Sequence, residues 1–155
     1  MSDYIAGKAL RKLLLGKKVD RATATLPQGD AGAIFTIAGG KVLMTGIVGE
    51  VTVAIGGANA TKLTANPTVA TAGDTDLCAT VEIDTCDVGD LLSITGTPTD
   101  TLLVAHKGAV QMLLVKGIIM QTGTLDLDCV GSVTGSVKWT IFYIPIDDGA
   151  YVTAA

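Results

Sequence analysis

The sequence predicts an all-β protein: an antiparallel β-sandwich or barrel with a jelly-roll-like topology, preceded by a short basic arm that is helical or extended. Alternating apolar and polar residues recur in short segments, which glycine, proline and asparagine turn signals separate. The 155 residues include 19 glycines, and only 17% are charged, a composition that favours short strands and tight turns. No helical pattern separates the segments, so the crossover helices that a parallel sheet requires are not predicted.

The clearest strand covers residues 135–146. Its alternate positions are apolar and predict one buried face, made of Val137, Trp139, Ile141 and Tyr143. From Phe142 onward the second face is apolar as well, with Ile144 and Ile146. We therefore expect the far end of this strand to be covered on both faces by another sheet, an arm or a partner.

Shorter segments of the same kind predict the other strands. In chain order they cover residues 21–26, 33–37, 41–55, 62–65, 77–84, 91–95, 101–105, 110–116, 118–128 and 150–155. In the long segment 41–55, Gly46 and Gly49 interrupt one face, which predicts a bend or a β-bulge. These strands suffice for two packed layers, and we assign them to a single β-sandwich domain at residues 22–155.

Residues 1–21 form a separate unit, a basic N-terminal arm. Six Lys or Arg and two Asp give the arm a charge of +4, whereas five Lys and thirteen acids give the rest of the chain −8. Between residues 4 and 15, apolar residues recur at helical spacing with basic residues on the opposite side, and Gly16 is a helix stop. A basic arm on an acidic body predicts docking on an acidic surface, either of another copy or of a different partner.

We expect the arm to contact this partner through eight residues: Lys8, Arg11, Lys12, Leu13, Leu14, Lys17, Lys18 and Arg21. Its amphipathic helix has three possible places: a groove on a neighbouring subunit, the surface of its own domain, or a membrane. Because the apolar face has no Trp or Phe anchor, no membrane partner is expected. The acidic, aromatic-poor body also excludes a specific nucleic-acid partner.

Candidate catalytic residues are scarce, and we expect neither enzymatic activity nor a cofactor. His106 is the only histidine and stands beside a predicted turn, which indicates a solvated side chain. No motif supplies the acid and the nucleophile that a general base needs. Cys78, Cys86 and Cys129 lack Cys-x-x-Cys spacing, so no zinc site is predicted, and Cys129 continues an apolar alternation that predicts burial.

Acidic residues gather in two parts of the chain. Six lie between residues 74 and 90, and Glu82, Asp84, Asp126 and Asp128 occupy alternate positions opposite apolar faces, where solvent exposure is expected. The loop at 84–90 has enough acids for a calcium ion, but its spacing does not match the EF-hand pattern. We therefore assign no metal site and keep calcium at this loop as an alternative.

The mean hydropathy of +0.51 is high for a chain without a long apolar run. No segment approaches the ~18 residues of a membrane helix, and the arm has neither the apolar length nor the cleavage site of a secretion signal. We therefore expect the surplus of apolar side chains to be buried between subunits of a homo-oligomer that assembles in the cytoplasm.

Three stretches resemble small virion structural proteins of tailed bacteriophages: the basic leader running into GKKVDRATATLP (16–27), KVLMTGIVGEVT (41–52) and GSVKWTIFYIPIDDGA (135–150). The resemblance lies in composition and cadence over most of the chain. It implies a non-enzymatic virion protein, such as a capsid decoration (cement) protein that binds the major capsid protein and stabilises the shell as an oligomer, commonly a trimer. The alternatives are a phage tail or head-to-tail component, and a carbohydrate- or receptor-binding β-sandwich module.

Overall fold

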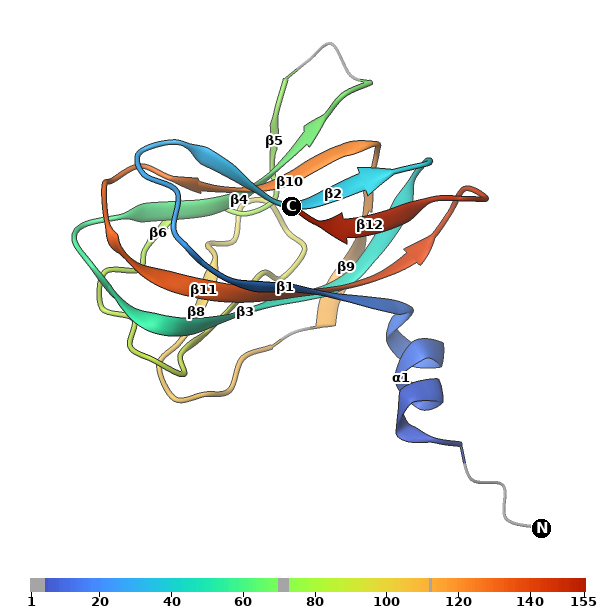
Figure 1. The fold of residues 1–155 in the computed structure, drawn as a ribbon, viewed down its shortest axis with the longest axis horizontal. Coiled ribbons are helices and arrows are strands. Elements are labelled where there is room, and N and C mark those ends of the chain that lie inside the picture. Colours follow the sequence, from blue (N-terminus) through green and yellow to red (C-terminus); the bar gives the residue numbers. More distant parts are fainter. Residues whose placement is uncertain (1–4, 70–72, 112) are drawn as a thin grey trace.

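Two antiparallel β-sheets packed face to face form the body of the protein, which confirms the predicted all-β sandwich (Figure 1). The computed structural model describes residues 5–69, 73–111 and 113–155. A short helix, α1 (Gly7–Leu15), precedes the first strand and extends away from the sheets (Figure 1). The N-terminal segment therefore stands apart from a compact body.

We name the two sheets after their central strands. The β11 sheet has the order β1 (Lys17–Thr25), β11 (Thr134–Pro145), β3 (Val42–Gly56), β7 (Leu91–Ser93) and β8 (Leu103–Ala105), and β9 (Leu113–Met120) also pairs with β3. The β10 sheet has the order β12 (Tyr151–Ala154), β2 (Ala31–Ala38), β10 (Gly123–Cys129), β4 (Ala60–Pro67) and β5 (Thr75–Asp76), and β6 (Val81–Glu82) also pairs with β4. From β1 to β4, and again from β9 to β12, successive strands alternate between the sheets, as the predicted jelly-roll-like topology requires.

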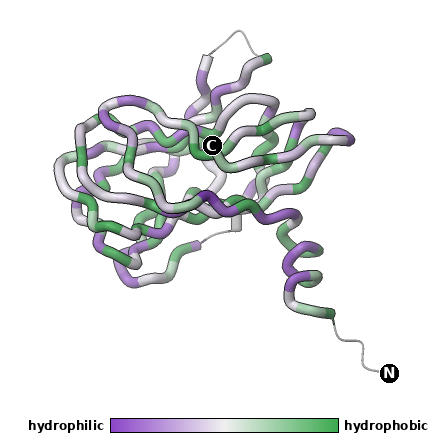
Figure 2. The backbone as a smooth tube through the Cα atoms, in the orientation of Figure 1, coloured by the Kyte–Doolittle hydropathy of each residue, from purple (hydrophilic) through white to green (hydrophobic). Residues whose placement is uncertain are grey.

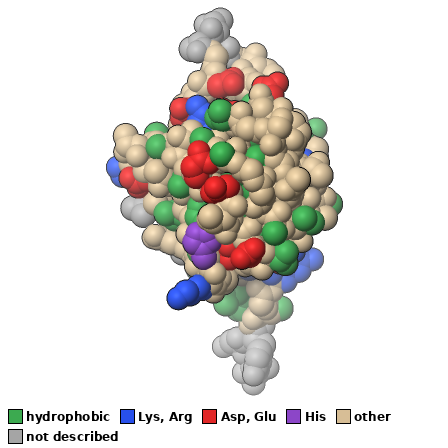
Figure 3. Space-filling view, turned by 90° about the vertical axis from the view of Figure 1, so that its left-hand side faces the viewer, with side chains coloured by type: hydrophobic (Ala, Val, Ile, Leu, Met, Phe, Trp, Pro, Cys, Tyr) green, Lys and Arg blue, Asp and Glu red, His purple; other side chains and the backbone are tan. Residues whose placement is uncertain are grey.

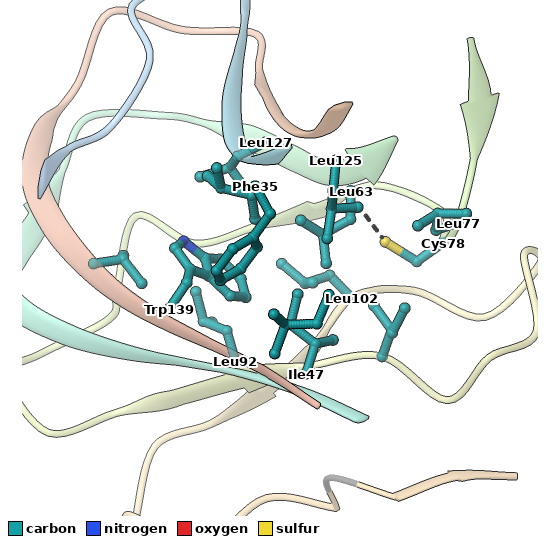
Figure 4. Packing of buried hydrophobic residues seen from close by; sticks show 14 of the residues in the cluster. Phe35, Ile47, Leu63, Leu77, Cys78, Leu92, Leu102, Leu125, Leu127 and Trp139 are labelled. Atoms are coloured by element: carbon teal, nitrogen blue, oxygen red, sulfur yellow. Dashed lines mark hydrogen bonds between the residues drawn. The ribbon is translucent and has the colours of Figure 1, made fainter. Parts of the chain in front are cut away.

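The core lies between the two sheets, and the β11 strand supplies its centre. The four inward residues predicted for this strand are all buried: Val137, Trp139, Ile141 and Tyr143. Trp139 faces Phe35 of β2 and Leu127 of β10 across the sandwich, with Leu92 below it (Figure 4). Hydrophobic and hydrophilic residues alternate along the backbone of both sheets (Figure 2), as expected when one face of each sheet is buried.

Strand β3 contains the irregularity that its glycines predict. Against β11 its pairing shifts by one residue at Thr45, and its pairing with β9 is also irregular between Met44 and Gly46. Gly49 has a different role, since it lies opposite Trp139 and a Cβ there would be 2.9 Å from the indole ring. Gly46 thus belongs to a β-bulge, whereas Gly49 leaves room for the largest core side chain.

The structure corrects two strand assignments. Residues 77–84 form only the two-residue strand β6 and an isolated bridge at Ala79, because the chain there follows the sheet edge rather than pairing along it. The segments predicted at 110–116 and 118–128 are divided elsewhere: β9 continues through Gly117 to Met120, and the turn comes at Gln121 and Thr122 before Gly123. Apolar alternation alone did not indicate which glycine lies in the turn.

Two burial expectations also change. Of the apolar residues at the end of β11, Phe142 is buried as predicted, but Ile144 and Ile146 are exposed. Conversely, Asp126 is buried rather than solvent-facing, because β10 lies inside its sheet and Asp126 is flanked by Ala33 on β2 and Thr64 on β4. The exposed isoleucines therefore lack a cover within the described chain.

Candidate functional site

Helix α1 exposes its apolar side. Leu13 is 73% exposed and Leu14 is 69% exposed, and Leu10 lies on the same side of the helix. The helix buries none of its residues. This confirms the predicted helix over its described part, and it places the predicted contact residues Leu13 and Leu14 on a free surface.

The helix is fixed to the body at its C-terminal end. It ends at Gly16, whose φ of +83° suits glycine, and a Cβ there would overlap the carbonyl group of Tyr143. The hydroxyl of Thr45, the bulged residue of β3, donates a hydrogen bond of 2.6 Å to the carbonyl oxygen of Leu15. The β-bulge and Gly16 together set where the helix leaves the sheet.

The basic side of α1 faces its own body. Together with the start of β1 it encloses a groove lined by Lys8, Arg11, Lys12, Gly16, Lys17, Lys18, Asp20 and Tyr143. Five of the predicted arm cations therefore come together in one concave surface, which we call the basic groove. Its positive charge suits an acidic ligand or an acidic protein surface.

The last residues of the predicted arm belong to the sheet. Strand β1 begins at Lys17, and Lys17–Arg21 pair with β11, so only the part before Lys17 stands outside the sandwich. Arg21 donates a hydrogen bond from its Nε to the carbonyl oxygen of Ala155, at 3.1 Å. This predicted contact residue therefore holds the C-terminal strand rather than contributing to the basic groove.

Lys18 and Asp20 form an ion pair of 2.7 Å within β1. The Lys18 ammonium group, together with the Thr140 hydroxyl that donates a 2.6 Å hydrogen bond from β11, lowers the pKa of Asp20. Asp20 therefore stays ionised at the edge of the basic groove, where it balances part of the positive charge.

An apolar row on the outer face of the β11 sheet lies near the base of α1. Strand register aligns Ile119 of β9, Leu43 of β3 and Ile144 of β11 side by side. Ile119 and Ile144 are exposed, and Ile144 also packs beside Gly16. The sequence shows these residues, but their alignment depends on register, which we did not predict. The leucines of α1 and this row are two exposed apolar groups that the described chain leaves uncovered.

A second group of reactive side chains lies at the opposite part of the β11 sheet. Asp90 precedes β7 and His106 follows β8, and the pairing of these strands brings Asp90 Oδ2 within 3.0 Å of His106 Nδ1. The Cys86 Sγ and one ligand atom from each of the other two residues all lie within 4.8 Å of one another. Figure 3 shows the histidine and several carboxylates together on this face. His106 lies in a turn with an exposed side chain, as the sequence indicated, but its contact with Asp90 was not predicted.

Burial governs the chemistry of this group. Cys86 and Asp90 are buried, whereas the His106 side chain is 52% exposed. Burial, followed by the charges of Asp90, Asp84 and Asp87, raises the pKa of Cys86 to about 11, so it is a thiol at neutral pH. A hydrogen bond from the backbone N–H of Asp87, and then the neighbouring His106, lower the pKa of Asp90.

The loop at 84–90, considered above for calcium, divides its acids between two environments. Asp84 and Asp87 are exposed, whereas Asp90 is buried and bonded to Asp87 N–H and His106. Within the described ranges, one group of three His, Cys, Asp or Glu side chains is arranged closely enough to hold a metal ion. It consists of a thiol, a carboxylate and an imidazole rather than three carboxylates.

Comparison with known proteins identified no relative of the chain. Among the residues that the structure describes, no helix has both the length and the apolar character to span a membrane. No family model, curated protein or solved structure matches the chain.

Proposed function

We propose that this chain is a non-enzymatic structural protein of a tailed-bacteriophage virion: a capsid decoration (cement) protein that forms a closed homo-oligomer, with a trimer as the favoured state. In this proposal α1 and the basic groove bind the acidic body of a neighbouring subunit or the major capsid protein. The observation that carries the proposal is the exposure of the apolar side of α1 while its basic side faces its own domain.

The energetics of a short helix support a partner. An isolated helix shorter than about 12–15 residues is marginal in water, and most helical stability comes from packing of an amphipathic face. Helix α1 spans Gly7–Leu15, and Leu10, Leu13 and Leu14 on its apolar face are exposed. Burying that face against a second protein removes exposed leucines from water, which stabilises the complex by roughly 25 cal/mol per Å² of apolar area buried.

Charge complementarity supports another copy of the chain as one such partner. The chain carries a net charge of −4, although its N-terminal segment is basic. Each copy therefore offers a positive groove and a negative body, which is the pattern that repeated subunits use to dock on one another. A virion shell presents many identical contact sites, and a protein that binds them has a structural role that requires no catalysis.

The first test is the solution mass of the full chain by light scattering after size exclusion. We expect a closed oligomer, and we expect the double substitution Leu13→Ser and Leu14→Ser to lower the mass toward the monomer. Val88→Ser is the matched control, since Val88 is also an exposed apolar residue but lies in the loop before β7. A monomeric parent chain contradicts the oligomer, and a double variant of unchanged oligomeric mass contradicts the role of α1 in it.

The second test addresses the virion. Particles purified by density gradient from cells that produce the phage should contain the chain in many copies, and mass spectrometry with immunogold labelling should place it on the shell. Labelling of the tail or the neck instead would favour the tail or head-to-tail alternative. Absence of the chain from the particles would overturn the virion assignment.

A further inference from the structure

We propose that Cys86, Asp90 and His106 form a binding site for a transition-metal ion, with Zn²⁺ as the natural occupant. The proposal is independent of the assembly role, because the site lies in the β7–β8 region and contains no residue of α1 or of the basic groove.

The geometry already suits a metal of this size. The three ligand atoms lie within 4.8 Å of one another. Zinc bonds of about 2.0–2.3 Å in a tetrahedron place ligand atoms about 3.3–3.6 Å apart. Small side-chain rotations therefore suffice to close the site around an ion. His106 is free to make them because half of its side chain is exposed.

The donor set selects the kind of ion. Calcium takes six to eight oxygen ligands, whereas zinc accepts thiolate, imidazole and carboxylate together. The group offers one of each from Cys86, His106 and Asp90. On binding, the Cys86 thiol loses its proton to solvent, and metal bonds replace the hydrogen bond between Asp90 and His106. Three protein ligands leave one coordination position for water.

The loop that supplies two of the ligands is held in place by backbone hydrogen bonds to β3. The Ile55 N–H donates to the Cys86 carbonyl oxygen, and the Val51 N–H donates to the Asp90 carbonyl oxygen, both at 2.9 Å. The Gly89 N–H donates to the Val51 carbonyl oxygen at the same distance. A site fixed in this way loses little conformational freedom on binding, which favours affinity.

The consequence for the molecule is a metal cross-link at the edge of the β11 sheet. It joins the 84–90 loop to the turn after β8, two segments that are 16 residues apart at Asp90 and His106. Because an ion that binds only the folded state stabilises it, the unfolding temperature should rise with the concentration of free Zn²⁺.

The test is a Co²⁺ titration of the full chain after treatment with a chelator, followed by absorption spectroscopy. We expect a thiolate-to-cobalt charge-transfer band that saturates at one ion per chain, that Zn²⁺ abolishes by displacement, and that Cys86→Ala eliminates. His106→Gln should weaken binding by at least 10- to 100-fold, the cost of losing even an outer-shell partner. Because His106 is half exposed, this variant decides the question if Cys86→Ala does not fold.

Two controls separate the site from other binding. Cys78→Ala removes another buried free thiol and should leave the band unchanged. Asp84→Asn with Asp87→Asn removes exposed carboxylates from the same loop and should also leave the band in place. No charge-transfer band in the parent chain, a band that survives Cys86→Ala or is unchanged by His106→Gln, or a band lost with the surface carboxylates alone would overturn the proposal.

Discussion

Trp139 is the residue that fits the two sheets together, and Gly49 makes its position possible. The indole ring is fully buried and lies over Gly49 on the neighbouring strand. A methyl group at position 49 would lie 2.9 Å from two ring carbons, which is closer than carbon atoms approach. Phe35 and Leu127 lie beside the ring in the core (Figure 4).

Gly49→Ala should therefore destabilise the protein by about 1–3 kcal/mol, the usual cost of overpacking a core. Equilibrium unfolding in urea measures the change. The matched control is Gly7→Ala at the start of α1, where no atom lies within 4 Å of the added methyl group, and there we expect no loss of stability. Equal stabilities of the parent and Gly49→Ala would show that the ring is not confined.

Asp20 gives a residue-scale prediction about pH. Lys18 and then Thr140 lower its pKa, so Asp20 stabilises the fold above its unfolded pKa of about 3.9 and loses that contribution as the pH falls through the lower folded value. Thr140→Val should raise the pKa of Asp20 and Lys18→Met should raise it further, as measured by NMR titration of the carboxyl carbon. Thr140→Ser keeps the hydroxyl and should keep the low pKa; a rise there would mean that the hydroxyl is not responsible.

At the scale of elements, β1 determines how much of the N-terminal segment is removable. A chain that starts at Lys17 lacks α1 but keeps every residue of β1, whereas a chain that starts at Ala22 loses the five residues that pair with the far half of β11. The second truncation also removes Val19, which packs against the core, and exposes the edge of β11.

We expect the chain from Lys17 to keep the unfolding temperature of the full chain within a few degrees and the chain from Ala22 to unfold at lower temperature or aggregate. Calorimetry and light scattering provide the measurements. A large loss of stability in the chain from Lys17 would mean that α1 is part of the folded body, and the free-helix interpretation would be wrong.

The same scale shows what a single sequence reveals. The strand at 135–146 and the helix ending at Gly16 were predictable, because their periodicities are local and long. Strands β7 and β8 lie within the predicted segments 91–95 and 101–105, whereas the two-residue strands β5 and β6 were not predictable, since their pairing depends on tertiary contacts. The boundary between the predicted segments 110–116 and 118–128 was misplaced for a related reason: a glycine inside a strand and a glycine in a turn have the same local signal.

The two candidate sites differ in the same way. The predicted contact residues of the arm follow from charge and helical spacing, and all but Arg21 lie on α1 or in the basic groove. The group around His106 escaped prediction because strand pairing brings Asp90 to it, and the register of Leu91 with Ala105 cannot be read from one sequence. The nearest signal in the sequence was the acidic loop at 84–90, which contains Cys86 and Asp90 but does not indicate His106.

At the scale of the whole molecule, charge and apolar surface meet at one end. The basic groove lies on one side of α1 and the leucines lie on the other, while the exposed Ile144 lies beside Gly16 at the base of the helix. The two kinds of contact respond oppositely to salt. Added salt screens charges, because it shortens the Debye length from about 10 Å at 0.1 M ionic strength to about 3 Å at 1 M. Sulfate, in contrast, strengthens apolar association.

Self-association should therefore weaken several-fold as the NaCl concentration rises, because salt screens the attraction between the basic groove and the acidic body. Sodium sulfate should restore part of the lost association. Sedimentation equilibrium measures both effects. Lys8→Glu with Lys12→Glu should remove most of the NaCl dependence, since both side chains line the groove. Lys107→Glu, an exposed lysine in the turn after β8, is the matched control and should leave the dependence intact. If neither NaCl nor either set of substitutions changes the association, the oligomer is held by its apolar surface alone. That result would exclude a role for charge complementarity.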